Sequence, residues 1–147
     1  MLDNAIGTIV IAGDARVPAL GCGTWQLRGE RCATIVAEAL RLGFRHIDTA
    51  QGYGNEAAVG DGIRASDVPR ETVFVTTKVM PHLISDGPLQ RSVEESLKRL
   101  RIERIDLQHL VEAHTKLYIH TDPPYTQLEH TVDRVIKKRD VLIAVKA

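Results

Sequence analysis

Three residues with complementary chemistry stand at, or just after, the ends of two apolar segments. Asp48 closes the segment FRHID, Lys78 closes the segment TVFVTTK, and Tyr53 lies between them in a glycine-containing loop. A free tyrosine has a pKa of about 10, but a nearby ammonium favours its phenolate, and a carboxylate beside the ammonium keeps it charged and in place. Such a trio predicts a general acid, able to protonate a carbonyl oxygen as hydride reaches the carbon.

A purely structural interpretation of the same residues stays open. Asp48 and Lys78 would then form an ion pair that bridges two strands, and Tyr53 would only pack against them. Asp48 could also serve only as the cap of the helix that follows it. Spacing alone does not separate these interpretations from catalysis.

The elements that must position these residues are short strands alternating with amphipathic helices. A hairpin is predicted first, over residues 8–20. The predicted strands that follow are ALGCGTW, FRHID, TVFVTTKV and RIDLQHLV. The predicted helices are 31–42, 55–65 and 88–100, the first ended by Gly43 and the last begun by Pro88.

Alternating strands and helices predict parallel strands with right-handed connections, and so an α/β architecture. The carboxyl ends of parallel strands face one side, which would bring Asp48 and Lys78 into one pocket. A doubly wound sheet and a (β/α)8 barrel both fit this pattern. The dinucleotide fingerprint GxGxxG of the doubly wound fold is not met by GCGTWQ, which has Gln26 at the third glycine position, and no GxxxxGK[ST] loop is present.

Composition narrows the class of protein further. Of the 147 residues 44% are hydrophobic and 26% are charged, as in ordinary soluble globular domains, and Lys plus Arg equals Asp plus Glu at 19 each. This balance gives no support to nucleic-acid or membrane-surface binding. No apolar run is long enough to span a bilayer and no signal peptide is recognisable, so a cytoplasmic protein is expected. Cys22 and Cys32 are expected to be reduced thiols.

The order of motifs resembles the N-terminal half of an aldo-keto reductase over about residues 8–107. The segments that carry the resemblance are VPALGCGTWQL, GFRHIDTAQGYGNEAAVGDGI, FVTTKV and SVEESLKRLRIERIDL. HIDTAQGYGNEAAVG is the most specific of them, because D-T-A, Y-G-N-E and their separation match together. The resemblance implies a (β/α)8 barrel that reduces a small-molecule aldehyde or ketone with NADPH.

The same resemblance implies roles for individual residues. Tyr53 would be the proton donor, Lys78 would favour its ionised form, and Asp48 would hold Lys78. Gly23, Thr24 and Trp25 would lie at the cofactor and substrate end of the pocket, after the first barrel strand. The opening hairpin would plug the floor of the barrel, and most residues that bind NADPH would lie in a C-terminal half.

The family's fourth catalytic residue is a histidine that ends the next barrel strand, and here the sequence departs from the pattern. His-Trp-Pro is missing, and QHLVEAHTKLYIHTDPPY stands in its place. We expect His120, which ends the apolar run KLYIH, to be the catalytic histidine, with His109 and His114 as alternatives. The histidines fit no compact metal-ligand motif, so no metal is expected.

The chain is expected to form one incomplete barrel domain over 1–147, well matched at 8–107 and divergent at 108–147. A closed (β/α)8 barrel takes about 250 residues, so about half of it would be present. A further helix from about Tyr125 and a strand VLIAV are predicted in the divergent part. Unpaired barrel edges predict self-association. Besides the reductase, a non-catalytic remnant that folds partly or as an oligomer therefore remains an alternative.

Overall fold

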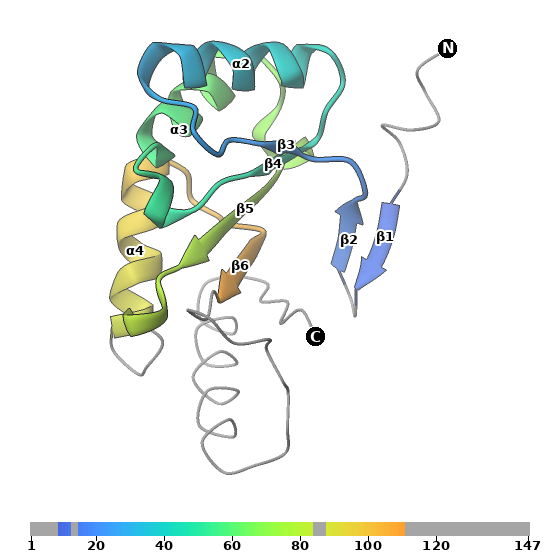
Figure 1. Cartoon of the computed structure of the whole chain (residues 1–147). Helices are drawn as coiled ribbons and strands as arrows, with labels where there is room; N and C mark the ends of the chain where they lie inside the picture. Colours follow the sequence, from blue (N-terminus) through green and yellow to red (C-terminus); the bar gives the residue numbers. More distant parts are fainter. Residues whose placement is uncertain (1–8, 13–14, 84–87, 111–147) are drawn as a thin grey trace.

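The computed structural model describes residues 9–12, 15–83 and 88–110. Strand β1 (Ile9–Ala12) pairs antiparallel with β2 (Ala15–Pro18), with Ile9 opposite Pro18 and Ala12 opposite Ala15. The predicted N-terminal hairpin is thus confirmed. Figure 1 shows this hairpin set apart from the helices, beside the main sheet.

The main sheet has four parallel strands in sequential order. They are β3 (Cys22–Gly23), β4 (His46–Asp48), β5 (Phe74–Val79) and β6 (Leu107–Leu110). The connecting helices are α2 (Gly29–Arg41), α3 (Glu56–Ala65) and α4 (Pro88–Leu100). All three predicted helices are present, and the last has the predicted bounds.

The arrangement of these elements distinguishes between the two α/β architectures. Figure 1 shows α2, α3 and α4 along one side of the sheet, with each helix connecting two strands that are neighbours in it. A doubly wound sheet reverses its strand order and carries helices on both faces. Sequential order with one layer of helices is the arrangement of a (β/α)8 barrel, so the described strands form part of such a barrel.

Side chains of the two sheet faces differ in character. Residues of β4 and β5 that face the helices are buried: Ile47, Val75, Thr77 and Val79. The intervening positions carry His46, Asp48, Phe74, Thr76 and Lys78, and successive residues of a strand point to opposite faces. Apolar side chains of all three helices complete the core, namely Val36, Leu40, Val59, Ile63, Leu89, Val93 and Leu100. The face away from the helices is therefore the more polar one.

Two predicted strands are shorter in the structure than in the sequence pattern. ALGCGTW contributes only Cys22–Gly23, because a turn closed by Leu27 N–H donating to Thr24 O begins directly after it. FRHID contributes only His46–Asp48, since Phe44 N–H still donates to Ala39 O of the preceding helix. The predicted helix from Tyr125 and the strand VLIAV lie outside the described residues.

The hairpin meets the sheet where its strands begin. His46, the first residue of β4, lies with Nδ1 3.1 Å from Pro18 O and Nε2 2.8 Å from Thr76 Oγ1. Because a carbonyl only accepts, Nδ1 carries the proton in this arrangement. The contact lies at the end of the sheet opposite the carboxyl strand ends.

Within the described part of the chain, no helix has the length and apolarity to cross a bilayer.

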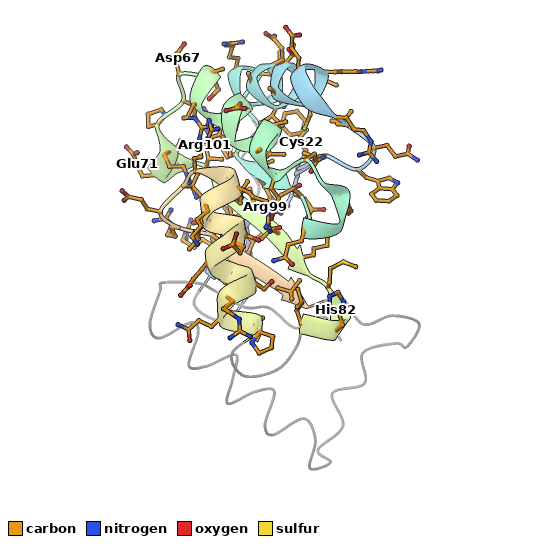
Figure 2. All side chains as sticks on the ribbon, turned by 90° about the vertical axis from the view of Figure 1, so that its left-hand side faces the viewer. Cys22, Asp67, Glu71, His82, Arg99 and Arg101 are labelled. Carbon is orange, nitrogen blue, oxygen red and sulfur yellow. The ribbon has the colours of Figure 1, made fainter. Side chains whose placement is uncertain are left out.

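Both cysteines are free thiols, and burial raises the pKa of each. Cys22 on β3, labelled in Figure 2, is half-buried, and Cys32 on α2 is buried. Cys22 adds a smaller upward contribution to the pKa of Cys32. Less thiolate is therefore available near neutral pH, and the thiolate is the reactive form.

We expect iodoacetamide to alkylate both cysteines slowly at neutral pH and faster as the pH rises, measured by mass spectrometry. In urea both thiols should react at the rate of free cysteine. If the thiols of the native protein reacted at that same rate, the expected protection by burial would be contradicted.

Candidate active site

The strand register brings Asp48 and Lys78 to the same place. Asp48 ends β4 and is level with Gly23 on β3 and Thr76 on β5. Lys78 lies two residues beyond Thr76, so it points to the same face one step nearer the carboxyl edge. This face is the more polar one, away from the helices.

Lys78 is the centre of a compact polar cluster. Its Nζ donates to Asp48 Oδ1 at 2.6 Å, to Thr49 O at 3.0 Å and to Tyr53 Oη at 3.3 Å. An ammonium has three protons, and these three acceptors use all of them. The Lys78 side chain is only 17% exposed, against 36% for that of Asp48. Because Tyr53 Oη accepts from Lys78, its own proton is left for a further acceptor.

A short turn presents Tyr53 to this cluster. The 3₁₀ turn Gln51–Tyr53 is closed by Tyr53 N–H donating to Ala50 O at 3.0 Å and ends at Gly54, whose φ is 65°. The left-handed conformation suits glycine and turns the chain into α3. Lys78 Nζ also lies 5.0 Å from the centroid of the Tyr53 ring. The three candidate residues thus meet as predicted, and Asp48 does not cap α3, whose N-cap is Asn55.

The residues after β3 form the neighbouring wall. The Trp25 ring meets the Tyr53 ring edge-on, with centroids 4.7 Å apart, and Trp25 is 61% exposed. A Cβ added at Gly23 would meet no atom within 4 Å, so open room lies beside the strand end. Gly23 and Trp25 thus leave space beside the site, and their predicted contact with a nicotinamide cofactor stays a prediction. Thr24 is fully buried, and its Oγ1 donates to Asp48 O at 3.1 Å, so a cofactor contact of Thr24 stays a prediction.

The candidate histidines differ in what the structure says of them. His120 and His114 lie outside the described residues, so the role predicted for His120 stays a prediction. His109 lies on β6, and the register places its backbone level with Lys78. The sequence pattern predicts that His109 lies inside its strand and not at its end. In the structure His109 is one residue before the end of β6, just as Lys78 is one residue before the end of β5, so this position does not separate His109 from Lys78.

Two buried polar residues next to the site were not singled out from the sequence. Glu56, at the start of α3, accepts from Thr77 Oγ1 and from Arg99 Nε of α4, each at 2.6 Å. Arg99 is labelled in Figure 2. Asn55 bonds residues on both sides of the site loop. Glu56 fixes the helix side of the strand that carries Lys78. Both residues belong to the motif Y-G-N-E, but no repeating pattern in the sequence predicts which residues they bind.

Comparisons with known proteins place this chain in a family. The sequence profile of the aldo/keto reductase family matches residues 19–142. Methylglyoxal reductase DkgB of Salmonella typhi is 46% identical over 91 residues, which cover 62% of this chain and 34% of that protein. The chain thus spans about a third of the length of the curated relatives it matches.

Solved structures agree with the fold described above. An aldo/keto reductase from Brucella melitensis has a TM-score of 0.81 and 29% identity, over 94% of this chain and 53% of that one. A Bombyx mori aldo-keto reductase in complex with NADP has a TM-score of 0.80 and 27% identity, over 94% and 50% of the two chains. The fold class predicted from the sequence, a partial (β/α)8 barrel with an N-terminal hairpin, is confirmed. Since the profile matches most of the sequence, this chain belongs to the aldo/keto reductase family.

Proposed function

We propose that the Asp48, Tyr53 and Lys78 cluster is the proton-donating part of a carbonyl reductase site, which converts a small aldehyde or ketone to an alcohol. The observation that carries the proposal is the position of Lys78 Nζ, within hydrogen-bond distance of both Asp48 Oδ1 and Tyr53 Oη. An ammonium so placed stabilises the charge that develops on a phenol oxygen as its proton leaves.

In the proposed reaction, Tyr53 Oη donates its hydrogen bond to the substrate carbonyl oxygen and then transfers the proton to it. Lys78 stabilises the resulting phenolate, and Asp48 keeps the ammonium charged and directed. NADPH, when bound, supplies the hydride for the carbonyl carbon. Gly23 and Trp25 would border its reacting end, and Trp25 would also confine the substrate. His120 would add a second polar contact to the carbonyl oxygen.

A binding and turnover measurement tests this proposal. We expect NADPH fluorescence to change saturably when the purified protein is titrated in, and NADPH absorbance to fall when methylglyoxal, named for the Salmonella relative, is added. NADPH without aldehyde is the control. Absence of NADPH binding at high protein concentration would contradict the proposal for this chain and favour a non-catalytic remnant.

Size-exclusion chromatography run beside the assay identifies the active species. Among the described strands, β3 and β6 stand at the two edges of the sheet. Self-association through such edges is part of the proposal, since a further strand on either would extend the barrel. Activity that follows a dimer peak would support it. Activity confined to a monomer peak would contradict it.

A further inference from the structure

We propose that Asn55 is a positioning residue that holds the Trp25 turn against the Tyr53 loop, and so sets how closely the Trp25 ring approaches Tyr53, where the proposed substrate would bind. The expected effect of Asn55 on turnover rests on the proposed function. The hydrogen bonds by which Asn55 joins two segments that are distant in the sequence do not depend on that function.

The starting observation is that Asn55 does not do what its place in the sequence predicts. It is the N-cap of α3, where an asparagine side chain ordinarily accepts from a backbone N–H of the first helical turn. Here the side chain makes no such bond. Asn55 is nevertheless 3% exposed, so its polar atoms need other partners.

Those partners lie on both sides of the site. Asn55 Nδ2 donates to Thr24 O at 2.8 Å and to Leu27 O at 3.0 Å, while Asn55 Oδ1 accepts from Thr49 Oγ1 at 2.8 Å. Both amide protons are therefore used on the segment that follows β3. Thr49 follows Asp48 directly, so one side chain ties the Asp48 strand end to the Trp25 segment.

The two carbonyls bound by Asn55 bracket the turn that contains Trp25. Leu27 N–H donates to Thr24 O at 3.1 Å across this turn, and Gln26 within it has a φ of 63°. A left-handed conformation is costly for a residue other than glycine and persists where its surroundings fix it. Asn55 supplies such fixation, and the held turn presents the Trp25 ring to Tyr53.

The Tyr53 turn has a separate anchor on its other side. Gln51 Nε2 lies 3.1 Å from Ser92 O, 2.5 Å from Ser92 Oγ and 2.9 Å from Ser96 Oγ, all on α4. Lys78 also holds the Tyr53 hydroxyl. Loss of the Asn55 amide should therefore release Trp25 while Tyr53 stays beside Lys78.

The test uses Asn55→Ala and the fact that Trp25 is the one tryptophan in the sequence. We expect the variant to lose most of the near-ultraviolet circular dichroism of the indole and part of its fluorescence anisotropy. In the turnover assay we expect KM to rise about tenfold with kcat nearly unchanged. This pattern is expected when a change weakens the binding of the substrate and of the transition state equally. Asn55→Ser removes the Nδ2 donors without burying a charge, and carries the test if the alanine variant does not fold.

Ser66→Ala is the matched control. Ser66 is 3% exposed, and its Oγ donates to Ile63 O at 2.7 Å, so its loss removes a buried hydrogen bond away from Trp25. If Asn55→Ala alters the Trp25 signals no more than Ser66→Ala does at equal loss of stability, the proposal is overturned. The optical signals need no turnover, so an inactive wild type would contradict the proposed function without deciding this inference.

Discussion

Tyr53→Phe is expected to lower kcat for aldehyde reduction by about 10²–10⁴-fold, the usual contribution of a general acid. The substitution removes the hydroxyl that would donate the proton and leaves the ring in place. Its packing against Trp25 and its position beside the Lys78 ammonium should therefore persist. Without Tyr53 Oη, the carbonyl oxygen has only water or a weaker donor to protonate it.

Rate and binding must be measured together to interpret this variant. We expect Tyr53→Phe to bind NADPH with nearly the wild-type affinity, seen by fluorescence titration, while the loss of NADPH absorbance with aldehyde almost ceases. Tyr125→Phe makes the same chemical change where the proposal assigns no role, and should keep the wild-type rate. A Tyr53→Phe variant with wild-type kcat would show that the phenol is not the proton donor.

The proximity of Asp48 and Lys78 follows from the regular elements that carry them. Asp48 and Lys78 could be paired because strand ends of a parallel sheet share an edge and because the period of two fixes their face. The bounds of the helix Pro88–Leu100 also follow from the sequence, because proline suits the first turn and the apolar positions have helical spacing. Local rules sufficed for these residues.

The parts of the site that the sequence did not predict depend on contacts between distant segments. Asn55 reaches Thr24 across 31 positions, and Thr24 donates to Asp48 across 24. Such bonds leave no periodic signal, and the local rule for Asn55 predicts a helix cap that does not form. The predicted bounds of β3 are too long for a different and local reason, since Thr24 O accepts from Leu27 N–H in a turn that begins directly after the strand.

Gly60→Ala is expected to lower the free energy of unfolding by about 3 kcal/mol, at the upper end of the usual cost of overpacking. In an isolated helix the same change would stabilise by up to about 1 kcal/mol. In this protein α3 crosses the end of α4 at Gly60. A Cβ there would overlap Leu100 O and lie 2.7 Å from Leu100 C. Backbone atoms cannot rotate away, so the two helices would have to separate.

That separation would disturb more than one contact, because Arg64 Nη1 donates to the same Leu100 O at 3.1 Å. Urea unfolding followed by far-ultraviolet circular dichroism measures the effect, and small domains are stable by only about 5–15 kcal/mol. Gly23→Ala is the control for stability. The added Cβ would meet no atom within 4 Å, so this substitution should change the midpoint of urea unfolding little. Equal midpoints for both variants would mean that α3 and α4 do not pack as closely as described. A selective loss in Gly60→Ala would show that this close approach helps to hold α3, and with it the Tyr53 loop, in place.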